Sequence, residues 1–144
     1  MDQARAMVAA ARACLGVPFA HQGRGRHGLD CLGLVLHAAS VAGCHVHGFV
    51  PARLDQRDYG ARPDVAVLRA RLDEYLKPID ALELGALLLL KVDGRAQHLA
   101  LVSDYPMDEG WAMVHAYAPA RKVVEHRLDA HWQSSIAAMY RLPA

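Results

Sequence analysis

Residues 28–35, with the sequence GLDCLGLV, place a cysteine directly after an aspartate at the start of an apolar segment. Apolar side chains recur there at three- and four-residue steps, which predicts a helix that begins at Cys31 and ends near Gly43. Asp30 is then the N-cap, whose carboxylate accepts hydrogen bonds from the free amides of the first helical turn. The positive end of the helix dipole is expected to favour the thiolate form of Cys31.

Two more helices are predicted in the first half of the chain. One covers the alanine-rich segment 3–15, and the other covers 65–76 with Asp64 as its N-cap. The inward side chains of the first are expected to be Met7, Ala10, Ala11 and Cys14. Those of the second are expected to be Val67, Leu68, Leu72 and Tyr75. Between the first helix and Cys31 lies a glycine-rich loop, 16–30, which can run close to a substrate.

The second half of the chain changes to the alternating pattern of β-strands. A short helical turn is predicted at 130–134, before the last strand. The predicted strands are 85–92, 97–103, 111–117, 122–128 and 137–142. Helices followed by a run of antiparallel strands predict a single α+β domain over residues 1–144. Its N-terminal helices should pack on a five- to six-stranded, mostly antiparallel sheet.

Composition narrows the class of protein. The 144 residues are 53% hydrophobic and 22% charged, as in ordinary globular domains, and the net charge is +1. This balance argues against non-specific binding of nucleic acid. The longest apolar runs, such as 6–11 and 85–90, are too short to span a membrane. The N-terminus has no secretory signal pattern, so synthesis in the cytoplasm without a signal peptide is expected.

The three cysteines have different surroundings. Their odd number and irregular spacing do not indicate a disulfide framework. Cys14 falls on the apolar side of the first helix and is expected to be buried. Cys44, His45 and His47 are donors of the kind that bind zinc, but in an extended segment Cys44 faces away from both histidines, so no metal site is predicted.

Cys31 is the candidate for a reactive thiol. Cysteine hydrolases need a thiolate, a histidine that carries a proton and a group that orients this histidine. His98 and His115 lie on neighbouring predicted strands, which can place side chains about 5 Å apart on one face. Since the chain has nine histidines, spacing alone leaves a catalytic and a structural role open for both. His27, His37, His126 and His131 carry no functional prediction.

Several segments resemble one family, the NlpC-type cell-wall cysteine peptidases, which are papain-like. Residues 15–19 (LGVPF), Gly23 and 28–35 resemble its nucleophile region. Residues 84–89 (LGALLL) and 98–102 (HLALV) resemble the strand before the catalytic histidine and the strand that bears it, and 114–116 (VHA) resembles the segment with the third catalytic residue. The loop PFAHQGR at 18–24 and the closing AMYRLP at 138–143 are most similar to phage-associated members.

The resemblance implies a papain-like NlpC-type fold and a set of roles. Cys31 would be the nucleophile, His98 the general base and acid, and His115 the residue that orients His98. The substrate would be a peptidoglycan stem peptide, cut between γ-D-glutamyl and diaminopimelate or lysine, with no metal or organic cofactor. The protein would act at the cell wall as part of a phage tail, with other tail proteins as partners.

Three further residues are candidate substrate contacts. His21 stands where the family often has a tyrosine near the thiol, and its imidazole can donate a hydrogen bond to the substrate. Asp30 is a candidate for binding a substrate amine, and Arg24 for contacting a stem-peptide carboxylate. Two other interpretations of the chain remain open. One is a phage tail-assembly module without hydrolysis, and the other is a thiol amidase or acyltransferase of the same fold.

Overall fold

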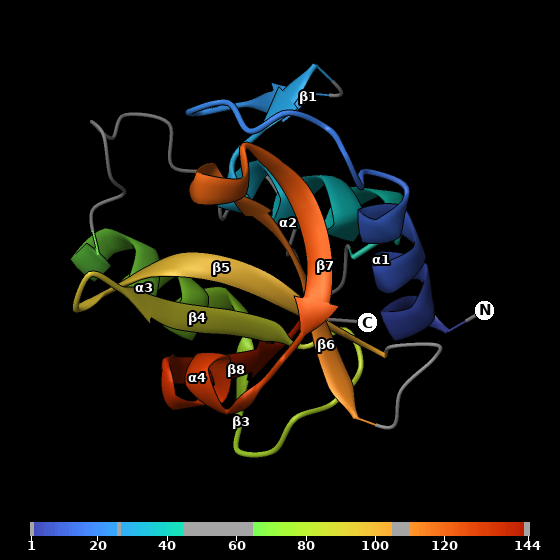
Figure 1. Ribbon diagram of the computed structural model, residues 1–144. Helices are drawn as coiled ribbons and strands as arrows, with labels where there is room; N and C mark the ends of the chain where they lie inside the picture. Colours follow the sequence, from blue (N-terminus) through green and yellow to red (C-terminus); the bar gives the residue numbers. More distant parts are fainter. Residues whose placement is uncertain (1, 26, 45–64, 105–109, 143–144) are drawn as a thin grey trace.

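The structure is a computed structural model that describes residues 2–25, 27–44, 65–104 and 110–142 (Figure 1). Its helices are α1 (Gln3–Arg12), α2 (Cys31–Val41), α3 (Val65–Tyr75) and α4 (Ala130–Ser134), with a 3₁₀ turn η2 at Ala118–Ala120. A small hairpin, β1 (Arg24–Gly25) and β2 (Gly28–Leu29), precedes α2. The main strands are β3 (Lys77–Ile79), β4 (Leu87–Val92), β5 (Arg95–Asp104), β6 (Trp111–Tyr117), β7 (Lys122–Arg127) and β8 (Ile136–Arg141).

The main strands form one antiparallel sheet in the order β3-β8-β4-β5-β6-β7. Figure 1 shows α2 behind β7, α1 to the right of the strands and α4 in front of them. The α+β prediction is therefore confirmed, with six strands in the sheet. None of the helices in the described ranges combines the length and the apolar composition needed to cross a bilayer.

Side chains alternate between two apolar layers, one on each face of the sheet. On β5, Leu99 and Leu101 belong to the layer shared with α1, α2 and α3. Ala100 and Val102 belong to the layer that faces α4, where Trp132 packs. This alternation assigns each strand histidine to one face, so it determines which of them can meet.

Most predicted boundaries are confirmed within a few residues, and the differences have physical reasons. Val67 was expected to face inward but is 38% exposed, because α3 buries the side containing Leu68 and Leu72 instead. The hairpin β1–β2 and strand β3 were not predicted. β3 contains Pro78, which is tolerated because the strand lies at the edge of the sheet and pairs only with β8. Asp64, the expected N-cap of α3, lies outside the described residues.

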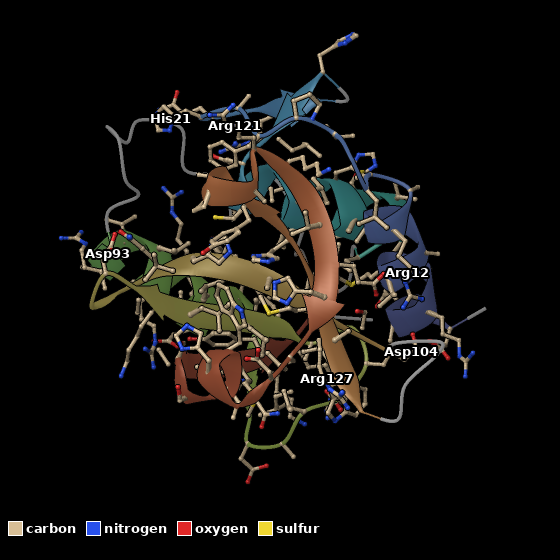
Figure 2. All side chains as sticks on the ribbon, in the orientation of Figure 1. Arg12, His21, Asp93, Asp104, Arg121 and Arg127 are labelled. Atoms are coloured by element: carbon tan, nitrogen blue, oxygen red, sulfur yellow. The ribbon has the colours of Figure 1, made fainter. Side chains whose placement is uncertain are left out.

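Ion pairs and hydrogen bonds connect α1 to the sheet that carries the histidines. Arg12 at the end of α1 binds both carboxylate oxygens of Glu125 on β7, with its Nη2 2.8 Å from Oε2. The same Nη2 also contacts the backbone oxygen and the carboxylate of Asp104 at the end of β5, and Figure 2 shows Arg12 and Asp104 close together. Ser103 donates a further hydrogen bond of 2.6 Å to Glu125. The network links α1 to the end of β5 and to Glu125 within β7.

Replacing Arg12 by alanine should destabilise the fold, because Glu125 would keep its partly buried charge with only the Ser103 hydroxyl, and no cation, to balance it. We expect a loss of about 1–3 kcal/mol in the free energy of unfolding, measured by calorimetry. Arg12→Lys should recover only part of it, because lysine keeps the charge but cannot bind both oxygens in one plane. In a protein that already carries Glu125→Gln, the Arg12→Ala change should lower the free energy of unfolding by a smaller amount. Equal losses of free energy with and without Glu125→Gln would contradict the coupling between Arg12 and Glu125.

Candidate active site

Cys31 is the first residue of α2, at the position predicted from the sequence. Asp30 caps the helix, and its Oδ1 accepts a 2.7 Å hydrogen bond from the amide of Gly33. The thiol lies half-buried beside β5, where the amides of Leu99 and Leu32 hydrogen-bond to the sulfur. Leu99 directly follows His98. The nucleophile candidate therefore lies next to the strand position that carries the first candidate histidine.

The N-terminal end of α2, which carries Cys31, lies against the sheet where the neighbouring strands β5 and β6 separate. The ladder between β5 and β6 runs from Leu101 paired with Val114 to Asp104 paired with Trp111. Beyond Leu101 and Val114 the strands diverge (Figure 1). His98 and His115 lie on these ends of β5 and β6, beyond the paired residues. Within the described part of the chain no hydrogen bond joins the Cys31 sulfur directly to His98.

His98 and His115 meet as the sequence analysis anticipated. Nε2 of His98 lies 2.6 Å from Nδ1 of His115, and the rings meet edge to face with their centroids 4.9 Å apart. Since Nε2 of His98 is engaged by His115, its Nδ1 is the ring nitrogen left to exchange a proton with a thiol. Tyr117 stacks on His115, and Trp132 of α4 packs against both histidine rings. The aromatic side chains hold the pair in a largely apolar environment.

Burial keeps both imidazoles neutral. His98 is 9% exposed and His115 is fully buried. Desolvation, with a smaller contribution from the neighbouring imidazoles, lowers the pKa of His98 to about 4 and the pKa of His115 to about 2. A neutral imidazole is the form that can accept a proton.

The sequence predicted that the helix dipole favours the thiolate form of Cys31, and this prediction is wrong. Burial and, to a smaller extent, the charge of Asp30 raise the pKa of Cys31 to about 12. The amides of Leu99 and Leu32 and the charge of Arg24 lower the Cys31 pKa, but by less. The helix dipole therefore does not outweigh desolvation and the neighbouring carboxylate. The resting pair is a thiol and a neutral imidazole, rather than a thiolate and an imidazolium.

Asp30 and Arg24, two predicted substrate contacts, contact each other. Nη1 of Arg24 lies 2.8 Å from Oδ1 of Asp30, and the amide of Gln22 donates to Oδ2 at 3.2 Å. With the bond from Gly33, these contacts join the glycine-rich loop to the start of α2. His21 is exposed on this loop (Figure 2). Contact of these side chains with a substrate stays a prediction.

Cys14 and Cys44 lie apart from this site. Both are buried, as expected for Cys14, and the Cys44 sulfur packs 3.8 Å from the sulfur of Met7. All three cysteines are free thiols. His45 and His47, the other members of the possible metal cluster, lie outside the described residues.

His126 is a member of the cluster that the sequence analysis missed. Its Nε2 lies 2.8 Å from Nε2 of His115, and its Nδ1 lies 2.9 Å from the backbone oxygen of Arg127. His115 pairs with Val124 across the β6–β7 ladder. His126 is two residues further along on the same face, within reach of a long side chain. The register of this hairpin was the signal that could have identified it.

A helix-borne thiol beside imidazoles on an antiparallel sheet is the arrangement implied by the resemblance to papain-like cysteine peptidases. No protein-family model matches the sequence, and no curated protein matches it. Solved structures do match, and NlpC/p60 domains are among them. The chain has the fold of these domains, as the sequence resemblance implied.

Three of these structures illustrate the likeness. The NlpC/p60 domain of the peptidoglycan hydrolase SagA is 18% identical, covers 96% of this chain and 98% of its own, and has a TM-score of 0.61. An NLP/P60 family protein from Staphylococcus aureus, described as similar to a lipoprotein, is 17% identical with a TM-score of 0.63. The match covers 99% of this chain but 42% of that one. The peptidoglycan hydrolase RipB of Mycobacterium tuberculosis is 21% identical over 99% of this chain and 65% of its own, with a TM-score of 0.57.

Proposed function

We propose that this chain is a cysteine peptidase that hydrolyses the stem peptides of peptidoglycan. The observation that carries the proposal is the position of Cys31 at the start of α2, with its sulfur on the backbone amide of Leu99, the residue that follows His98, while His98 is paired with His115. Two of the proteins that share the fold are named as peptidoglycan hydrolases. The substrate class is taken from this likeness and from the sequence motifs.

The first chemical step follows from the ionisation of the site. As the thiol of Cys31 approaches the scissile carbonyl, Nδ1 of His98 takes its proton, and the new thiolate forms a bond to the carbonyl carbon. The carbonyl oxygen becomes an oxyanion, which the backbone amide of Cys31 itself, at the start of α2, is suited to stabilise. In this step His115, whose Nδ1 lies 2.6 Å from Nε2 of His98, would accept the Nε2 hydrogen of His98 and leave Nδ1 of His98 available to the thiol.

The second half of the reaction returns the site to its starting state. The oxyanion collapses, the carbon–nitrogen bond breaks, and His98 gives its proton to the leaving amine. This leaves an acyl group on Cys31 as a thioester. Water then attacks the thioester while His98 takes one of its protons, and the thiol is released with that proton. No step needs a metal or an organic cofactor.

The finer assignment rests on the sequence motifs. We propose cleavage between γ-D-glutamyl and diaminopimelate or lysine, with Arg24, Asp30 and His21 as candidate contacts at the loop. The loop and the closing segment favour a role at the cell wall as part of a phage tail, carried there with other tail proteins. A tail-assembly module without hydrolysis, and a thiol amidase or acyltransferase, are the alternatives.

Purified protein incubated with purified peptidoglycan should release new amino termini, measured by amine labelling, and Cys31→Ala should release none. Cys14→Ala is the matched control, because this buried cysteine lies apart from the site, and it should keep the activity. Parallel assays on diaminopimelate- and lysine-containing peptidoglycan assign the bond. Hydrolysis of unrelated amides alone would favour the amidase, and hydrolysis of nothing would favour the structural module. Full activity of Cys31→Ala would refute the proposal.

A further inference from the structure

Three imidazoles form a continuous hydrogen-bonded chain across the sheet. It runs from His98 on β5 to His115 on β6 at 2.6 Å, and from His115 to His126 on β7 at 2.8 Å. It ends at the backbone oxygen of Arg127, 2.9 Å from Nδ1 of His126. The ring nitrogens bind one another in sequence instead of converging on one point. In the described ranges no group of histidine, cysteine and carboxylate side chains is arranged to hold a metal ion.

The oxygen at the end of the chain determines where the hydrogens lie. A carbonyl oxygen only accepts, so Nδ1 of His126 carries a hydrogen. In neutral His126 the other nitrogen, Nε2, is then an acceptor, and it must receive the Nε2 hydrogen of His115. Nδ1 of His115 is consequently an acceptor for the Nε2 hydrogen of His98. This leaves Nδ1 of His98 without a hydrogen, as a general base requires.

We propose that His126 is a positioning residue of this site, which couples the Arg127 carbonyl through His115 to the tautomer of His98. The inference rests on the proposed peptidase function. His126 touches neither the thiol nor the substrate in this scheme. It acts by holding His115, and through it His98, in the one pattern of hydrogens that leaves Nδ1 of His98 free to accept the proton of Cys31.

The three hydrogen-bonded imidazoles also provide a place for the positive charge that forms when the thiol of Cys31 attacks the carbonyl. When Nδ1 of His98 takes the thiol proton, the Nε2 hydrogen of His98 can move to Nδ1 of His115. The Nε2 hydrogen of His115 can then move to Nε2 of His126. The numbers of protons and charges are unchanged, and the charge ends on His126. His126 is more exposed than His98 or His115, so the charge is better solvated there.

Few other titratable groups lie around the three imidazoles. Tyr117 of β6 stacks on His115, and His131 of α4 contacts the outer edge of Trp132. Trp132 itself packs against all three rings of the chain. Glu125, next to His126, belongs to the opposite face of β7, where Arg12 binds it. A packing role for His126 under Trp132 is therefore the alternative that the experiment must separate.

Two substitutions separate hydrogen bonding from packing. His126→Phe keeps a ring under Trp132 but removes the acceptor for His115, and His126→Gln offers an amide oxygen that can accept this hydrogen. On a soluble stem tetrapeptide, His126→Phe should lower kcat by about 10- to 100-fold, with KM changed less than about twofold. His126→Gln should recover most of kcat. His131→Phe, which alters only the far side of Trp132, should behave as the unmodified protein.

The same inference predicts the tautomers directly, in a measurement that needs no activity. Nitrogen-15 NMR of the unmodified protein should show the Nε2–H form for His98 and His115 and the Nδ1–H form for His126. The opposite tautomer at His98 or His126 would overturn the inference, as would full kcat in His126→Phe or equal losses in both His126 variants. If the unmodified protein cleaves nothing, the proposed function fails, and the NMR result still decides the hydrogen pattern.

Discussion

Replacing His98 by alanine is expected to lower the turnover of stem peptides by about 10³- to 10⁴-fold. The reason is the high pKa of Cys31, about 12, which leaves only about one thiol in 10⁵ ionised near pH 7. Without a neighbouring base, the reaction must draw on this small fraction. The loss should fall on kcat and not on KM, because His98 removes a proton instead of holding the peptide.

The pH dependence distinguishes loss of the base from loss of the fold. In the His98→Ala protein the rate should rise about tenfold per pH unit between about pH 7 and pH 9, because the thiolate fraction grows in this way below the pKa of the thiol. The unmodified protein should show no such slope, since its His98 is already neutral above its pKa of about 4. His37→Ala, an exposed histidine on α2, is the control and should keep full activity. Retention of a tenth of the turnover by His98→Ala would contradict the assigned role.

Replacing Gly33 by alanine is expected to destabilise the protein by about 2–3 kcal/mol, with a fall of about 5–10 °C in Tm. A Cβ at this position would overlap the backbone oxygen of Gly23 and lie 3.2 Å from Oδ1 of Asp30. The Gly23 oxygen cannot retreat easily, because it accepts hydrogen bonds from the amide of Asp30 and from Arg24. The loop would have to move away from α2, and the surroundings of Cys31 would change with it.

Gly25→Ala is the matched control for this substitution. It lies in the same loop, but nothing lies within 4 Å of the position of its Cβ, so its Tm should change by less than about 2 °C. Thermal unfolding and peptidoglycan cleavage should be measured on both proteins. A Gly33→Ala protein as stable and as active as Gly25→Ala would show that the close approach of the loop to the helix is not needed.

The local features of the site could be predicted because each depends on short-range chemistry. An aspartate before an apolar run at helical spacing predicts a cap, and the structure shows Asp30 binding the amide of Gly33. Alternation along the strands separates the two faces of the sheet. For the same reason, His98 and His115 were recognised as residues that could meet. Their contact needs only adjacent strands and a shared face.

What could not be predicted depends on register and on burial. His126 joins the chain only because the β6–β7 hairpin aligns His115 with Val124, and the length of the intervening turn decides that alignment. The ionisation of Cys31 depends on how much water the loop excludes from the thiol, which no spacing in the sequence reveals. Val67 was assigned to the wrong side of α3 for a similar reason, because several apolar residues of that helix compete for one buried side.

The neutral state of Cys31 has a consequence for its chemical durability. Peroxides and other oxidants attack thiolates far faster than thiols, and the products beyond sulfenic acid are irreversible. A sulfur that carries its proton until a substrate carbonyl arrives therefore presents a poor target to these reagents. The burial that makes the proposed peptidase depend on His98 would also preserve its nucleophile in an oxidising medium, where no reductant restores a damaged cysteine.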